Sequence, residues 1–212
     1  MAPRVYMMLG SAPCRLVRLV ASLCNYDIDI VEIDLMKGEH KTEDYLKINP
    51  RHCVPCLVDE DLVMTESRAI AQRILTLTNS SFIPENIDVR SKVDEMVQYD
   101  LGILYKRIGD FVYPQLFANA EPDQDKKEMV KSSLLYLDNI LSKSENLVSS
   151  TFTLADLTIR ISLTMLEFTD LDFTEYPHLS RWMKKVEEIN SNTWKIVNLQ
   201  FKMWVTSVKN KS

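Results

Sequence analysis

Residues 4–24 read RVYMMLGSAPCRLVRLVASLC and place a strand, a tight turn and a helix in close succession. The apolar run at 4–9 has the length of one buried strand, and Gly10 to Pro13 are turn-forming residues. After the turn, apolar residues recur at spacings of three and four, which predicts a helix with one buried face. They are Leu16, Val17, Leu19, Val20, Leu23 and Cys24. The segment therefore predicts a strand that leads directly into a helix N-terminus.

The residues that follow extend this segment into a small α/β domain. Residues 28–35 alternate as a second strand does, and the polar stretch at 37–49 allows a short helix at most. Residues 54–58 and 62–64 read as strands joined by an acidic turn too short for a crossover, which predicts an antiparallel hairpin. A helix is predicted over 66–77. The order βαβ then ββα, with the first two strands parallel, is typical of a thioredoxin-like domain.

Beyond residue 78 the sequence has helical periodicity and no strand pattern. Residues 79–88 are polar, include Pro84 and predict a linker. Apolar periodicities at 93–108 and 129–140 predict helices, and Thr153 with Asp156 predicts a capping box before a largely buried helix. The predicted fold class is α/β plus all-α, with a thioredoxin-like domain at 1–78, a linker at 79–88 and an all-helical domain at 89–212.

Charge and hydropathy exclude several classes of function. The 212 residues include 25 basic and 30 acidic residues, a net charge of -5, which argues against a nucleic-acid or anionic-membrane surface. No stretch approaches the roughly 18 consecutive apolar residues of a membrane span. Ser11, Arg15 and Arg18 interrupt the first apolar run, unlike a signal peptide. We therefore expect a cytoplasmic protein.

The four cysteines lie in the first quarter of the chain. Cys53 and Cys56 form a C-x-x-C, a pattern that can bind zinc or carry redox chemistry. Pro55 lies between them and no second Cys/His pair follows at the spacing of a zinc finger, so no metal site is expected. A thiol–disulfide oxidoreductase that works through Cys14 is one alternative function, although Ser11 occupies the usual position of its nucleophile.

Ser11 stands where a helix N-terminus offers free N–H groups and a partial positive charge. In redox proteins of this layout a cysteine occupies the position, and the helix stabilises its thiolate. A serine hydroxyl can instead donate a hydrogen bond to a thiolate that belongs to a bound molecule. The simpler interpretation is that Ser11 only caps the helix.

Two further motifs can bind an extended peptide. In thioredoxin-like folds a cis-proline at the position of Val54-Pro55 leaves the preceding backbone free to pair with a peptide. At the start of the next helix, Ser67 can bind a carboxylate through its hydroxyl and backbone N–H. Glu66 can bind an amino group, and Arg68 adds a cation. Ordinary capping explains Glu66 and Ser67 equally well.

Together these motifs resemble the cytosolic glutathione S-transferases, specifically the insect delta class. The likeness rests on GSAPCR at 10–15, LMKGEH at 35–40, NPRHCVP at 49–55, ESRAI at 66–70, YDLGILY at 99–105, YPQ at 113–115 and FTLAD at 152–156. It implies an enzyme of detoxification, a cytoplasmic homodimer that conjugates reduced glutathione, its co-substrate, to hydrophobic electrophiles. Ser11 would be the catalytic residue that hydrogen-bonds the glutathione sulfur.

The resemblance also implies which residues bind glutathione. They are His40, His52, Cys53, Val54, Pro55, Glu66, Ser67, Arg68 and Asp100. The two histidines would bind the glycyl end, although they otherwise read as exposed loop residues. Val54 would pair with the cysteinyl backbone, and Glu66 with Ser67 would bind the γ-glutamyl end, braced by Arg68 and Asp100.

The hydrophobic electrophile is expected between the two domains. Its candidate contacts are Ala12, Pro13, Leu35, Tyr105, Ile108, Tyr113, Leu116, Phe117 and Phe201. Aromatic residues at helical spacing are often only core. One alternative function is a weakly catalytic, ligandin-like carrier that binds glutathione and apolar ligands. Another is an interaction protein that does not bind glutathione.

Overall fold

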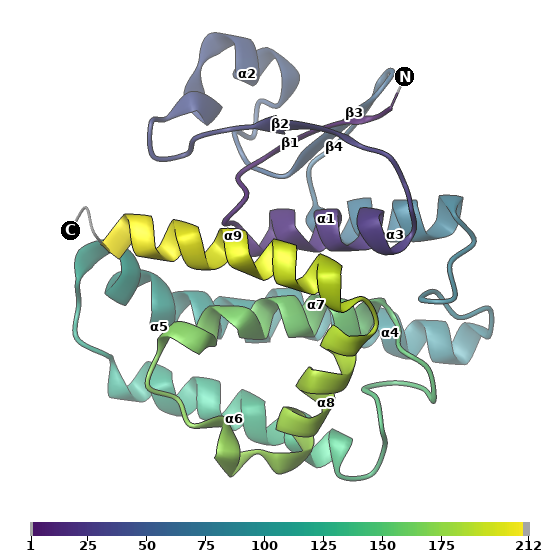
Figure 1. Cartoon of the computed structure of the whole chain (residues 1–212), viewed down its shortest axis with the longest axis vertical. Coiled ribbons are helices and arrows are strands. Elements are labelled where there is room, and N and C mark those ends of the chain that lie inside the picture. The colour runs from purple at the N-terminus through teal and green to yellow at the C-terminus, as the bar shows by residue number, and fades with distance from the viewer. Residues whose placement is uncertain (1, 210–212) are drawn as a thin grey trace. The chain divides into compact units, whose positions relative to one another are not determined.

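The computed structural model describes residues 2–209, with side chains described as far as residue 206, and forms two compact units (Figure 1). The first unit comprises the chain up to Ser80 together with Asn192–Trp204, and the second comprises Ser81–Ser191 and the chain from Val205. The first is α/β and the second is helical, so the predicted fold class is confirmed. The sequence prediction placed all of 89–212 in the helical domain, whereas the structure groups residues 192–204 with the first unit.

A four-stranded mixed sheet forms the middle of the first unit. β1 (Arg4–Met7) lies between β2 (Asp29–Glu32) and β3 (Cys56–Asp59), and β4 (Leu62–Met64) forms an edge, in the order β2-β1-β3-β4. β1 and β2 are parallel, whereas β3 runs antiparallel to both β1 and β4. The parallel first pair and the antiparallel hairpin predicted from the sequence are confirmed.

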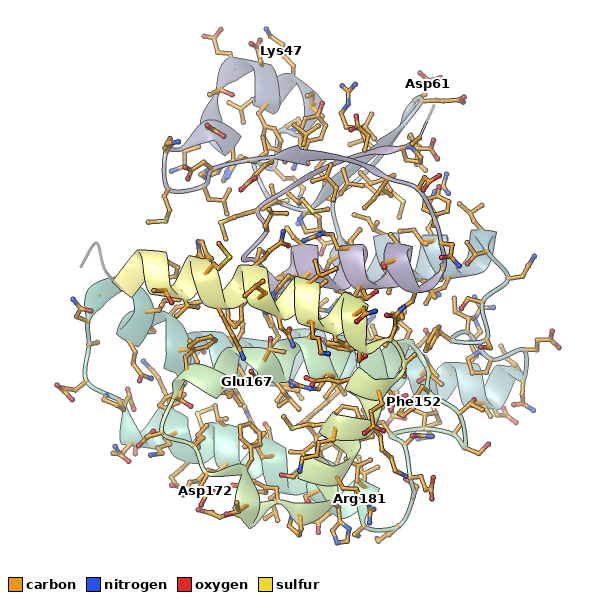
Figure 2. All side chains as sticks on the ribbon, viewed as in Figure 1. Lys47, Asp61, Phe152, Glu167, Asp172 and Arg181 are labelled. Carbon is orange, nitrogen blue, oxygen red and sulfur yellow. The ribbon has the colours of Figure 1, made fainter. Side chains whose placement is uncertain are left out.

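Helices cover both faces of this sheet (Figure 1). α1 (Ala12–Leu23) and α3 (Ser67–Leu77) pack against each other on one face, and the short α2 (Glu43–Ile48) lies on the other. Charged side chains such as Lys47 on α2 and Asp61 in the β3–β4 turn point outward (Figure 2). The sheet is therefore the central layer of three, as in a thioredoxin-like domain.

The alternation of β1 explains this layering. Val5 and Met7 are fully buried and share one face of the strand. Tyr6 points to the other face, where its ring meets Tyr45 of α2 edge-to-face at a centroid distance of 5.7 Å. Each face of β1 thus has its own apolar cluster, and a shift of the register by one residue would exchange them.

The C-terminal helix α9 (Ser191–Lys209) contributes its first part to the first unit. Trp194 is buried, and the fully buried Arg15 of α1 donates a hydrogen bond of 3.2 Å to Oδ1 of Asn198. The same guanidinium lies 4.0 Å from the centroid of the Phe201 ring, which is a cation–π contact. Arg15 therefore joins α1 to α9 through both polar and aromatic contacts.

The second unit is built from helices around a central one. The helices are α4 (Ile87–Tyr99), the π-helix η2 (Asp100–Leu104), α5 (Tyr105–Ala118), α6 (Gln124–Leu141), α7 (Leu154–Leu163) and α8 (Pro177–Glu188), with 3-10 segments η3 (Thr164–Phe168) and η4 (Phe173–Glu175). Every residue of α7 is buried, and α7 contacts α4, α5 and α8. Within the described part of the chain, no helix has the length and apolarity needed to cross a bilayer.

A buried carboxylate, Asp156, holds the start of α7. Oδ2 accepts hydrogen bonds from the N–H and the hydroxyl of Thr153 at 2.8 and 3.0 Å, which confirms the predicted capping box. Oδ1 accepts from the N–H of Leu147 at 3.1 Å and from Nε1 of Trp182 in α8 at 2.9 Å. One side chain therefore joins the preceding loop, the helix start and a neighbouring helix.

We expect Asp156→Ala to lower the free energy of unfolding by about 3–5 kcal/mol, because it leaves four buried donors without their acceptor. Asp156→Asn should lose less, since the amide keeps one acceptor oxygen. Urea unfolding followed by circular dichroism measures both losses. A loss below about 1 kcal/mol for Asp156→Ala would show that water or relaxation replaces the network.

Candidate functional site

Ser11 is the N-cap of α1, in the turn that joins β1 to the helix. Its N–H donates to the carbonyl of Met8 at 3.0 Å, and its own carbonyl accepts the first helical bond from Arg15 at 2.9 Å. Its backbone is extended, as at an N-cap, yet among the described residues its side chain makes no capping hydrogen bond. The hydroxyl thus lies at the helix N-terminus and, within the described residues, does not cap the helix.

The thiol of Cys14, one turn into α1, is fully buried. Burial raises the pKa of Cys14 to about 11, and hydrogen bonds from Ser11 and the Met8 backbone lower it by less. At pH 7 about one such thiol in 10⁴ is ionised. This gives no support to redox chemistry through Cys14. Cys53 also acts on this pKa, so the loop before β3 lies within electrostatic range of the turn.

That loop is held by Asn49, a buried residue that the sequence analysis did not single out. Nδ2 of Asn49 and the hydroxyl of Tyr45 both donate to the carbonyl of Cys53, at 2.8 and 2.7 Å. Oδ1 of Asn49 accepts from the N–H of Arg51 at 3.1 Å. The signal in the sequence was an Asn-Pro pair after a short helix, which marks a turn but not what the side chain contacts.

The Val54–Pro55 peptide bond is cis, as the family resemblance implied, although trans is the default before proline. The structure also brings the two predicted histidines together, with ring centroids 6.2 Å apart. His40 lies in the 3-10 turn η1 (Glu39–Lys41), and His52 has a left-handed φ of 44°. Burial lowers the pKa of His40, which favours the neutral form of its ring. The pair can donate hydrogen bonds to an anion.

The N-terminus of α3 presents the third motif. Glu66 is the N-cap, and its Oε1 accepts from Nη1 of Arg51 at 2.7 Å in an exposed ion pair. Ser67 is buried, and its hydroxyl accepts from Nη1 of the buried Arg68 at 3.2 Å. The first N–H groups of a helix have no acceptor within that helix. The motif therefore combines a hydroxyl, a guanidinium and helix N–H groups suited to a carboxylate.

Asp100 is fully buried at the start of the π-helix η2, in the second unit. The apolar periodicity at 93–108 predicts one continuous face that includes Leu101. Leu101 is instead exposed, because a π-helix adds a residue to the turn and rotates the residues within it. The expected face resumes at Leu104, which is fully buried.

The predicted electrophile contacts of the second unit lie on two sides of α5. The hydroxyls of Tyr105 and Tyr113 are 2.8 Å apart, and the Tyr113 ring lies 5.8 Å from that of Phe117. These form an aromatic, partly exposed face. Ile108 and Leu116 are buried in the core of the unit.

In the first unit, the predicted electrophile contacts lie in three different places. Ala12 and Pro13 are in the first turn of α1, beside Ser11. Leu35 packs with the apolar cluster that includes Tyr45. Phe201 is buried and packs on Arg15, so it joins α9 to α1.

A further residue, Trp204, borders the Ser11 turn and was not among the predicted site residues. A Cβ atom on Gly10 would lie 2.4 Å from Cγ of Trp204 and 2.5 Å from its Cδ2. The Trp204 ring stacks on Phe201 at a centroid distance of 6.1 Å. Gly10 thus leaves room for the indole against its backbone. The apolar character of the C-terminal stretch did not indicate this contact with Gly10.

Among the residues that the structure describes, no group of three or more His, Cys, Asp or Glu side chains is placed to hold a metal ion.

The chain matches two family models along most of its length. The model "Glutathione S-transferase, N-terminal domain" matches residues 5–81, and "Glutathione S-transferase, C-terminal domain" matches residues 94–190. Two curated relatives come from Anopheles gambiae. Glutathione S-transferase D7 is 29% identical over 201 residues, covering 93% of this chain and 92% of its own. Glutathione S-transferase 2 is 32% identical over 180 residues, covering 84% and 86%.

Solved structures agree with these matches. A glutathione transferase from Bombyx mori superimposes with a TM-score of 0.92 at 26% identity, covering 98% of both chains. A delta-class glutathione transferase from Nilaparvata lugens superimposes with a TM-score of 0.85 at 35% identity, covering 95% of this chain and 99% of its own.

We expect Gly10→Ala to lower the free energy of unfolding by about 1–3 kcal/mol, because the added methyl overlaps the indole of Trp204. Trp204→Ala removes that overlap. The double variant should therefore lose less than the sum of the two single losses, in a double-mutant cycle measured by thermal unfolding. Strictly additive losses would show that Trp204 does not lie on Gly10 in solution.

Proposed function

Because the chain belongs to the glutathione S-transferase family and is of the insect delta type, we propose that Ser11 stabilises the thiolate of bound glutathione. The protein is a glutathione transferase that conjugates reduced glutathione to hydrophobic electrophiles. One observation carries the proposal for Ser11. Ser11 is the N-cap of α1, and its hydroxyl makes no capping hydrogen bond within the described residues.

The chemistry needs a thiolate at neutral pH, whereas a free thiol has a pKa of about 8.5. A hydrogen bond from the Ser11 hydroxyl and the partial positive charge of the α1 N-terminus both favour the ionised sulfur. The thiolate then donates an electron pair to the electrophile, and a carbon–sulfur bond forms. In a substitution, the leaving group departs with the electron pair of the bond that breaks. In an addition, the electrophile takes up a proton instead. No covalent bond to the enzyme forms in this scheme.

The remaining motifs would bind the rest of glutathione. The backbone of Val54, before the cis Pro55, would pair with the cysteinyl residue. Ser67 and the N–H groups of α3 would bind the γ-glutamyl carboxylate, and Glu66 the amino group. Arg51 already pairs with Glu66 at 2.7 Å, so it would hold that carboxylate in place. Cys53 would act by holding this loop in place, since its carbonyl already accepts hydrogen bonds from Tyr45 and Asn49.

The two histidines, His40 and His52, would bind the glycyl carboxylate. Arg68 and Asp100 would brace the γ-glutamyl end, as the family resemblance implied. The aromatic face of α5, with Tyr105, Tyr113 and Phe117, is part of the proposed electrophile site. Ala12 and Pro13, beside Ser11, complete the part nearest the sulfur.

We also propose a cytoplasmic homodimer. Exposed apolar side chains support self-association: Leu62 and Val63 on the edge strand β4 are 41% and 45% exposed. An edge strand with apolar side chains is ordinarily covered by another surface.

Replacing Ser11 with alanine should lower kcat/KM for conjugation of an aryl halide by about 10- to 100-fold, the effect of one hydrogen bond to a charged group. The pH–rate profile should shift to higher pH, because the bound thiol loses its stabilising donor. Cys14→Ala is the matched control in the same turn and should keep most of the activity. If Cys14→Ala abolished conjugation while Ser11→Ala kept it, the assignment of Ser11 would be wrong.

His40→Gln and His52→Gln should each raise KM for glutathione by about 3- to 10-fold with kcat within about twofold, as expected when an interaction with a non-reacting part of the substrate is lost. Steady-state kinetics with glutathione varied at fixed electrophile measures both constants. A fall in kcat with KM unchanged would place the histidines at the reacting sulfur instead of the glycyl end.

A further inference from the structure

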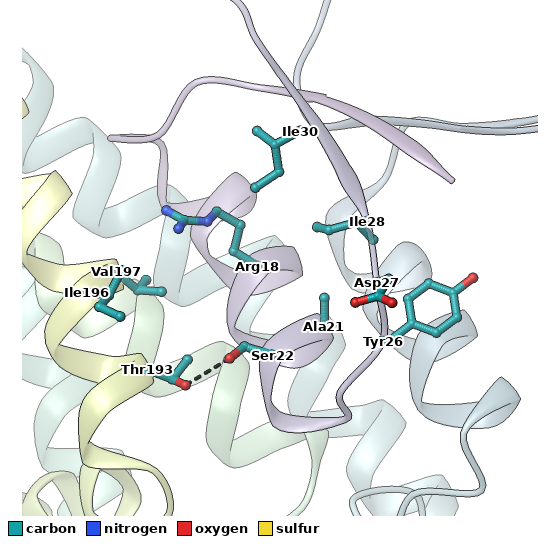
Figure 3. Close-up of a pocket in the computed structure, with 10 residues that line it drawn as sticks. All are labelled: Arg18, Ala21, Ser22, Tyr26, Asp27, Ile28, Ile30, Thr193, Ile196 and Val197. Carbon is teal, nitrogen blue, oxygen red and sulfur yellow. Dashed lines mark hydrogen bonds between the residues drawn. The ribbon is translucent and has the colours of Figure 1, made fainter. Parts of the chain in front are cut away.

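A pocket lies wholly within the first unit, lined by α1, the loop after it, β2 and the first part of α9 (Figure 3). Its volume is about 280 Å³, close to the lower limit of about 300 Å³ for small-molecule sites. None of its lining residues is among those proposed to bind glutathione or the electrophile. It is therefore separate from the catalytic site in its residues.

Aliphatic side chains make up half of the lining of this pocket, and polar side chains make up most of the rest. Ile28 follows α1, Ile30 is in β2, and Ile196 and Val197 are on α9 (Figure 3). Ile30 and Ile196 are 39% and 53% exposed, so they present apolar surface to the solvent. An apolar ligand body would remove that surface from water, which is favourable.

A single cation, Arg18, reaches into these aliphatic walls from α1 (Figure 3). Its Nη1 donates to the neutral Oε1 of Gln200, and it forms no ion pair with any described carboxylate. Burial lowers the pKa of Arg18, so this cation is partly stripped of water without a charged partner. A guanidinium has five donors, and an anionic ligand would accept from those that Gln200 does not use.

An acidic residue, Asp27, lies across the pocket from Arg18 (Figure 3). It is exposed, in the loop after α1. A ligand with one anionic group at Arg18 avoids this carboxylate, whereas a second anionic group at its far end would approach it. The pocket therefore selects for a single negative charge at one end of an apolar body.

We propose that this pocket binds a medium-chain aliphatic monocarboxylate, with the carboxylate on Arg18 and the chain against Ile28, Ile30 and Val197. At about 30 Å³ for each water-sized unit, the pocket holds roughly nine heavy atoms. Octanoate, with about ten heavy atoms, fills this volume when its carboxylate lies at the rim. The site is independent of the proposed role of Ser11.

Calorimetric titration with octanoate tests the proposal on protein saturated with S-hexylglutathione, which occupies the glutathione and electrophile sites. We expect octanoate to bind the saturated protein, and octanol and the dianion suberate to bind less tightly. Arg18→Met should weaken octanoate at least about tenfold, the effect of losing a charge-assisted hydrogen bond. Asp27→Asn should narrow the difference between octanoate and suberate. Absence of octanoate binding to the saturated protein, or equal affinity in Arg18→Met, would overturn the proposal.

A matched pair on α9 keeps the test decisive if Arg18→Met fails to fold. Ile196 lines the pocket and Leu199 does not, yet both are aliphatic, on one helix and exposed to a similar degree, 53% and 58%. Ile196→Asp should weaken octanoate at least about tenfold, and Leu199→Asp by less than about twofold. Equal weakening by both would mean that octanoate responds only to net charge, and would overturn the site.

Discussion

Burial of α1 is the constraint on which the first unit depends. Most of its residues are inaccessible, because the sheet and α3 cover one side and the first part of α9 covers another. Arg15 illustrates the constraint, since a fully buried guanidinium must have partners, and Asn198 and Phe201 provide them. A helix held in this way fixes where its N-terminus lies. The position of Ser11 is therefore a result of packing and not of the turn alone.

The sequence correctly predicted those structural elements that depend on residues close together in the chain. The strand, turn and helix around Ser11, the hairpin after Pro55 and the capping box at Asp156 all follow from periodicity, chain length or the chemistry of a few neighbouring residues. It could not predict contacts between segments far apart in the chain. The apolar character of Trp204 was evident, but its contact with Gly10 depends on how α9 packs. The added residue in the π-helix left no pattern, so Leu101 was placed on the wrong face.

Packing of α9 on α1 also relates the two sites that we propose. Ser11 is at the N-terminus of α1, and Arg18 lies two turns further along the same helix. Trp204 of α9 lies against Gly10 in the Ser11 turn. Val197, also on α9, lines the pocket that contains Arg18. The two sites use different side chains but share both supporting helices. A ligand that favoured one arrangement of α9 on α1 would therefore change the affinity of both sites for their ligands.

The fluorescence of Trp204, whose indole lies against Gly10, responds to changes beside the Ser11 turn. Of the three tryptophans in the chain, Trp182 and Trp194 are each 1% exposed and shielded from the solvent, whereas Trp204 is only partly buried. Indole emission depends on the polarity around the ring, so a molecule that arrives beside the Ser11 turn alters the emission of one fluorophore against a steady background from two others. The intrinsic fluorescence of the unlabelled protein is therefore a local signal from the Ser11 turn.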